Sequence, residues 1–180
     1  MKKGVNRLGQ IWVETVIYTL IALAMIGAVL AFIVPKIGEI QDKSIIEQSL
    51  NAMKDINNVV LSVVQGGPGN KRLVEANIKK GTLKIDGRND QEEGNRTIFE
   101  METDYVYSEP GTEISIGEVK AITQNIGGTN IITLTTNYNY DIIPNELRII
   151  EHSTTPYTIS IENKGDTDLD GKIEVEILVS

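Results

Sequence analysis

A short acidic segment near the C-terminus has the residue types and spacing of a metal site. Aspartates alternate at Asp166, Asp168 and Asp170, and a glycine follows them. Alternating carboxylates can act together as Ca²⁺ ligands, and the glycine permits the sharp turn of a calcium-binding loop. The EF-hand pattern has a bidentate acid at its twelfth position, which here is Ile177, so Glu174 at the ninth position is the candidate fourth ligand. A solvated acidic hairpin turn explains the same residues, and both interpretations stay open.

A single carboxylate, Glu14, lies at the start of an apolar segment near the N-terminus. The chain from Thr15 to Pro35 carries no charge. A helix of roughly 20 residues spans the ~30 Å hydrocarbon core of a bilayer at ~1.5 Å per residue. A carboxylate inside that core costs on the order of 2.5–3.5 kcal/mol, so such groups tend to have partners. Glu14 is therefore a candidate functional charge, the alternative being a place in the headgroup layer.

Other candidate chemistry is sparse. His152 is the only histidine and cysteine is absent, so the groups for nucleophilic catalysis are poorly represented and we expect no enzyme. Asn95 opens an Asn-Arg-Thr sequon in a turn, which makes it a candidate glycosylation site on an exported chain. Calcium is the one cofactor that the sequence suggests.

The periodicity of apolar residues predicts an α+β fold. Apolar positions recur at helical spacing from Ile46 to Val64, which extends the N-terminal helix through residues 10–65, with a membrane-spanning part at about 11–34. A Gly/Pro-rich turn at 66–71 ends the helix. Residues 72–180 show seven or eight alternating segments separated by turn residues, which predicts a β-sandwich head, with an immunoglobulin-like arrangement as one form.

The charge distribution predicts the orientation of this anchor. The net charge is -8, and the basic leader at 1–9 precedes an apolar segment and an acidic body. The positive-inside rule therefore places the N-terminus in the cytoplasm and the head outside. An acidic body also argues against nucleic acid as a partner. The apolar segment is too long for a secretory signal peptide, whereas a plain uncleaved anchor remains an alternative.

The order of parts at the N-terminus is more specific than an anchor requires. A Lys/Arg leader is followed by Gly9 and Gln10, by Glu14 fifth from that glutamine, and by ~20 apolar residues. This order resembles the N-terminus of an archaeal type IV pilin precursor. The resemblance implies cleavage by a prepilin peptidase between Gly9 and Gln10. It also implies that Glu14 neutralises the N-terminal amine of a neighbouring subunit during assembly.

The same resemblance implies a function, a location and partners. The subunit would enter the cytoplasmic membrane with its N-terminus inside and then join a helical cell-surface filament made of copies of itself. The prepilin peptidase, an assembly ATPase and a membrane platform would be its other partners. Two alternatives remain: an archaellin or minor pilin, and a monomeric membrane-anchored binding protein with a β-sandwich ectodomain.

Overall fold

A computed structural model describes residues 7–88, 94–146 and 148–180 of the chain, with side chains from residue 12 onward. The basic leader before residue 7 lies outside the described residues. The chain divides into two compact units, with the boundary between Ile40 and Gln41.

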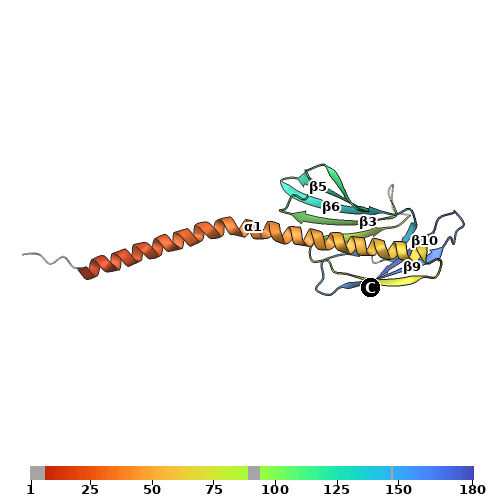
Figure 1. Cartoon of the computed structure of the whole chain (residues 1–180), viewed down its shortest axis with the longest axis horizontal. Helices are drawn as coiled ribbons and strands as arrows, with labels where there is room; N and C mark the ends of the chain where they lie inside the picture. The colour runs from red at the N-terminus through yellow and green to blue at the C-terminus, as the bar shows by residue number, and fades with distance from the viewer. Residues whose placement is uncertain (1–6, 89–93, 147) are drawn as a thin grey trace, which may run out of the picture. The chain divides into compact units, whose positions relative to one another are not determined.

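One long helix, α1 (Arg7–Gln65), contains 59 residues and runs through the boundary between the two units (Figure 1). Within the first unit it consists mainly of apolar residues, and it continues through Pro35. Proline removes one backbone hydrogen bond from a helix interior but does not always end the helix. The long N-terminal helix that the sequence predicts is therefore confirmed.

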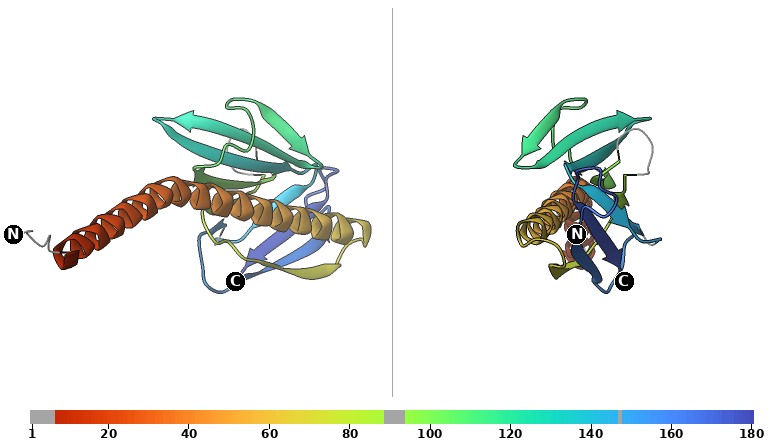
Figure 2. Two further views of the ribbon diagram at one scale, coloured as in Figure 1. Left: turned by 60° about the vertical axis from the view of Figure 1, so that its left-hand side comes forward. Right: turned by 90° about the vertical axis from the view of Figure 1, so that its right-hand side faces the viewer.

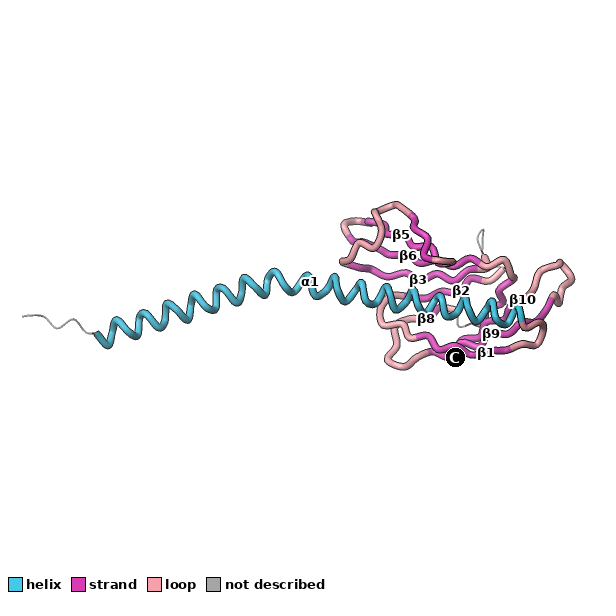
Figure 3. The backbone as a smooth tube through the Cα atoms, in the orientation of Figure 1, coloured by secondary structure: helices cyan, strands magenta, loops and turns pink. Residues whose placement is uncertain are grey.

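Ten strands follow the helix among the described residues, more than the seven or eight that the sequence predicts (Figure 3). Their bounds are β1 (Lys71–Ala76), β2 (Thr82–Asp86), β3 (Arg96–Thr103), β4 (Glu113–Ile116), β5 (Val119–Ile126), β6 (Thr129–Asn137), β7 (Asp141–Pro144), β8 (Ile149–Ile150), β9 (Tyr157–Gly165) and β10 (Glu174–Val179). β4, β7 and β8 have only two to four residues each, too few to show a period-two pattern in the sequence.

The strands form two sheets that share one core. One sheet has the order β1-β9-β10-β7, and the other has the order β4-β5-β6-β3-β2-β8. The β7–β10 pair is parallel, and the other pairs are antiparallel. Phe99 on β3 lies opposite Leu134 on β6, and both are fully buried. The predicted α+β class with a β-sandwich head is confirmed, while an immunoglobulin-like arrangement stays a prediction.

The part of α1 that belongs to the second unit packs along both sheets (Figure 2). Its buried side chains recur at helical spacing and belong to the same core as the strands: Ile46, Leu50, Met53, Ile56, Val60 and Val63. Each fully buried aliphatic side chain contributes about 1.5–3 kcal/mol relative to exposure. The helix is therefore part of the core of the head and not an addition to it.

The C-terminal end of α1 is closed by its own turn and by a residue of β9. Gly67 has a φ of 81°, the left-handed conformation that favours glycine after a helix. Asn163, 1% exposed, donates from Nδ2 to the carbonyl oxygens of Val63 and Val64 at 3.1 and 3.4 Å. The last carbonyls of a helix have no partner within it. Asn163 thus satisfies the Val63 carbonyl and is a second donor to the Val64 carbonyl, which also accepts from the backbone N–H of Gly67 at 3.2 Å.

Candidate functional site

The apolar surface of α1 in the first unit is a candidate interaction surface. Every residue from 12 to 37 is exposed, including Trp12 at 71% and Phe32 at 73%. Soluble proteins rarely expose contiguous apolar surface on this scale, so such a surface marks an interaction site. By length and composition, the helix could cross a membrane.

Glu14 is the acidic residue within this surface. Tyr18, one helical turn further along α1, donates a hydrogen bond from its hydroxyl to Glu14 Oε1 at 3.2 Å. Thr19 next to it donates instead to the backbone carbonyl of Thr15 at 2.8 Å. Gly9 and Gln10, the predicted processing site, fall within the bounds of α1, but their side chains lie outside the described residues. The processing and assembly roles stay predictions.

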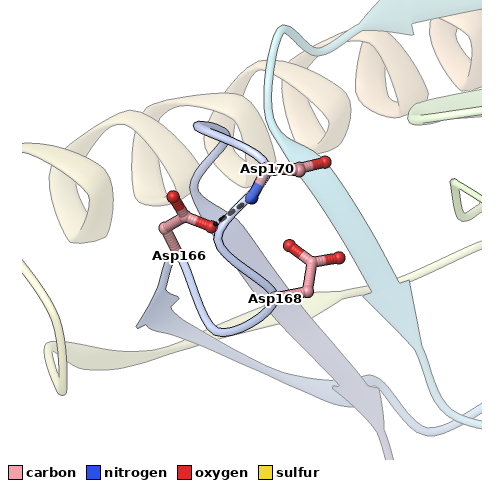
Figure 4. Close-up of side chains that lie close together, drawn as sticks. All are labelled: Asp166, Asp168 and Asp170. Carbon is pink, nitrogen blue, oxygen red and sulfur yellow. Dashed lines mark hydrogen bonds between the residues drawn. The ribbon is translucent and has the colours of Figure 1, made fainter.

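The three predicted aspartate ligands lie together in the loop between β9 and β10 (Figure 4). Asp166, Asp168 and Asp170 each offer a carboxylate oxygen within 4.8 Å of the others, and all three residues are exposed. The Asp166 carboxylate accepts hydrogen bonds from the backbone N–H groups of Asp170 and Gly171 at 3.1 and 3.0 Å. These bonds to backbone N–H groups are consistent with the acidic-turn interpretation.

Glu174, the predicted fourth ligand, belongs to a different cluster. It is 3% exposed, and its Oε1 accepts from Arg88 Nη1 at 3.1 Å while its Oε2 accepts from Thr167. Arg88 also donates to Asp168 at 2.5 Å and to Asp141 at 3.5 Å. The guanidinium therefore supplies positive charge to three carboxylates, one from the β9–β10 loop and one each from β7 and β10.

This cluster changes what the acidic loop can bind. The hydrogen bond from Arg88 lowers the pKa of Asp168, and the same bond raises the pKa of Arg88. A calcium ion held by the three aspartates would have to compete with Arg88 for Asp168, and Glu174 would have to leave both of its partners. The described geometry thus fits a loop organised by Arg88 better than the four-ligand set. Calcium at this loop stays a prediction.

Asn95, the candidate glycosylation site, is half-buried. Its Nδ2 donates to Asp141 Oδ1 at 3.0 Å, and its Oδ1 accepts from the backbone N–H of Ile142 at 2.8 Å. Asn95 also adopts a φ of 63°, a conformation that asparagine tolerates better than most residues. These contacts explain an asparagine here without a glycan, because a glycan on Nδ2 would disturb the bond to Asp141. Glycosylation stays a prediction.

Asp42 is a buried charge on α1 that the sequence pattern did not single out. Asp42 is 6% exposed and accepts from Lys80 Nζ at 2.7 Å and from the backbone N–H of Asp104 at 2.8 Å. Burial by itself raises the pKa of Asp42, but the hydrogen bonds from Lys80 and Asp104 outweigh it and hold the pKa below the usual 3.8. The contact joins the helix to two loops of the head.

The residues that sequence reasoning missed differ in how easily they could have been found. Tyr18 lies four residues after Glu14, a spacing that places both side chains on one helix face and is readable from the sequence. Arg88 is 80 residues from Asp168 and 86 from Glu174, and nothing local indicates the pairing. The single histidine, His152, is exposed in the segment between β8 and β9.

Comparison with known proteins adds no family to this description. No family model, no curated protein and no solved structure matches the chain. The class that the fold defines is an α+β protein with one apolar helix of membrane-spanning length and a β-sandwich head.

Proposed function

We propose that this chain is a structural subunit of an archaeal type IV pilus-like surface filament, assembled through its apolar N-terminal helix after removal of the leader. The observation that supports this most is the exposed apolar surface of α1 from 12 to 37 in a chain whose head has its own core. Such a helix is stable where lipid or other helices cover it.

In the proposed assembly, the apolar surface of α1 has two successive environments. In the cytoplasmic membrane, with the N-terminus inside, lipid covers the helix. In the filament, helices of neighbouring copies replace the lipid. Ala24 and Ala28 lie four residues apart, as do Gly27 and Ala31, and small residues at this spacing let helices approach closely. Gly27 has open space where a side chain would begin, so another helix meets no obstruction from the chain itself.

In the proposed filament, the charge of Glu14 fixes how neighbouring subunits align. Cleavage between Gly9 and Gln10 removes three basic residues and creates a new N-terminal amine. An amine from a neighbouring copy is a suitable partner for a carboxylate that is otherwise costly in an apolar medium. The peptidase, an assembly ATPase and a membrane platform are the further partners in this proposal, and the head faces the outside of the cell.

The alternative is a monomeric membrane-anchored binding protein. An anchor of that kind needs an apolar helix but gains nothing from a carboxylate at position 14. The two functions therefore differ in the mature N-terminus and in the oligomeric state of the chain.

Mass spectrometry of material sheared from the cell surface tests the proposal. We expect a high-molecular-weight fraction that contains the chain with Gln10 as its first residue. A full-length chain that is found only in membranes would contradict the proposal and support the anchored monomer.

A pair of variants sharpens the test. Glu14→Gln should abolish or strongly reduce the sheared filament while cleaved subunits remain in the membrane, because a neutral side chain cannot pair with the amine. Glu39→Gln is the matched control, since the Glu39 carboxylate lies on the same helix in a solvent-accessible pair with Lys36 at 2.8 Å. Equal filament yields from both variants would overturn the role of Glu14.

A further inference from the structure

The hydrogen bond between Tyr18 and Glu14 connects two polar groups on the apolar surface of α1. The Tyr18 hydroxyl lies 3.2 Å from Glu14 Oε1, and the two residues are four apart. Residues at this spacing are neighbours on one face of a helix. Both residues are exposed in the single chain, so the bonded pair lies on the surface that lipid or another helix would cover.

Within the described side chains, no basic group of the first unit lies close to Glu14 along the helix. The sequence has no charged residue from Thr15 to Pro35, and Lys36 is roughly six helical turns further on. In hydrocarbon, water does not replace a missing donor, and an unsatisfied polar group costs several kcal/mol. A donor on the same helix is therefore valuable to Glu14 before another subunit arrives.

Tyrosine is well suited to this task. Its ring is apolar enough for the boundary of a bilayer, and its hydroxyl is a donor that adds no charge. A carboxylate can accept about four hydrogen bonds, so the bond from Tyr18 leaves capacity for a cation. The pair can thus exist in the membrane and persist when an amine from a neighbouring copy joins it.

We infer that Tyr18 is a positioning residue for assembly: its hydroxyl holds the Glu14 carboxylate on the helix face while the subunit is in the bilayer and presents it to the cationic group of a second copy. This inference rests on the proposed function, because it takes the membrane and the filament as the two environments. It adds a residue that supports Glu14 within its own chain.

Infrared spectroscopy tests the hydrogen bond directly and needs no filament. The full chain, labelled with ¹³C at glutamate carboxylates, is placed in phospholipid vesicles, and the spectrum of Glu14→Gln is subtracted to isolate the Glu14 band. We expect Tyr18→Phe to shift this band. Thr19→Val is the matched control, because it removes a neighbouring hydroxyl that donates to a backbone carbonyl. An unchanged Glu14 band in Tyr18→Phe would overturn the inference.

The yield of sheared filament tests the consequence for assembly. Side-chain hydrogen bonds between membrane helices average about 0.6 kcal/mol, and a bond of the same strength within one helix corresponds to about a threefold change in a population. Tyr18→Phe should therefore lower the filament yield about threefold while cleaved subunits stay in the membrane, and Thr19→Val should match the wild type. A wild-type yield from Tyr18→Phe would overturn the positioning role. If the unmodified chain forms no filament, the proposed function fails. The infrared result still shows whether Tyr18 donates a hydrogen bond to Glu14 in the membrane.

Discussion

The two parts of α1 are stabilised in different ways, although they belong to one continuous helix. From residue 12 to 37 every residue is exposed, and the exposed side chains are mostly apolar. From Ile46 to Val63 one face is fully buried in the core of the head, and Asn163 satisfies carbonyls at the helix end. Continuity of a helix therefore does not imply a uniform environment.

The difference in burial indicates that one part of α1 serves the folding of the head and the other serves interaction with a membrane or with other subunits. The second part of α1 packs one face into the core of the head, so substitutions on that face should affect the stability of the head. Among the described side chains of the first part, contacts such as Tyr18 with Glu14 are local ones along the helix. Substitutions in the first part should affect the membrane or the assembly and leave the head unchanged.

The largest expected effect comes from the buried face. Ile56→Ala should lower the free energy of unfolding of the head by about 3–4 kcal/mol, because Ile56 is fully buried and its truncation leaves a cavity. Ile26→Ala, with the residue 55% exposed, is the matched control and should change it by less than about 0.5 kcal/mol. Denaturant titration of the full chain in detergent micelles measures both. Similar losses of stability from the two variants would show that the buried and exposed parts of α1 contribute equally to the stability of the head.

An intermediate effect is expected at the end of the helix. Asn163→Ala removes the donor to Val63 and Val64 and the acceptor of the Gly165 N–H at 2.8 Å, which should cost about 1–3 kcal/mol. Hydrogen exchange should also accelerate in the last turn of α1. Asn125→Ala is a suitable comparison, because Asn125 is itself exposed and bonds to the half-buried Asn130, so its loss should be nearly neutral. Unchanged exchange in Asn163→Ala would contradict the capping role.

The smallest expected effect distinguishes two acidic residues on either side of the unit boundary. Asp42→Asn should lower the stability of the head by about 1 kcal/mol at neutral pH, because its partners Lys80 and Asp104 lose a charged acceptor. Glu39→Gln should have an effect near zero, since its pair with Lys36 is exposed.

The contribution of the Asp42 carboxylate to the stability of the head should decrease as the pH falls. The pKa of Asp42 is lower in the folded chain than the usual 3.8, so the unfolded chain binds more protons in this range. The contribution of the carboxylate is complete above 3.8 and is lost as the pH falls through the folded pKa. Stability curves of the wild type and Asp42→Asn should therefore converge in acid. Parallel curves down to pH ~2 would show that the charge of Asp42 is not responsible.

Much of the fold was predictable because its signals are local. Helical spacing from Ile46 onward and the alternation along β3 can each be read within a few residues, and both patterns match the observed burial. β7 and β8 could not be predicted in this way, because pairing with distant strands defines such short segments. The parallel pairing of β7 with β10 likewise has no local signal.

The candidate calcium site also combines features that are local in the sequence with contacts that are not. The proximity of Asp166, Asp168 and Asp170 follows from their places in one short loop, and the sequence predicted it. The assignment of Glu174 to the same group did not anticipate Arg88, whose guanidinium binds Glu174 and Asp168 from a distant loop. A count of positions along a motif contains no information about a partner 86 residues away.

The sequence by itself determined the apolar helix, the charge beside it and the order of helix and strands, because these properties depend on residues within a few positions of one another. Only the tertiary structure decided that Asn163 caps α1, that Asp42 meets Lys80 and that Arg88 gathers the carboxylates of the acidic loop and its neighbours. Such contacts join residues 38 to 100 positions apart, and their energy is available only after the chain has paid the entropy of closing those loops.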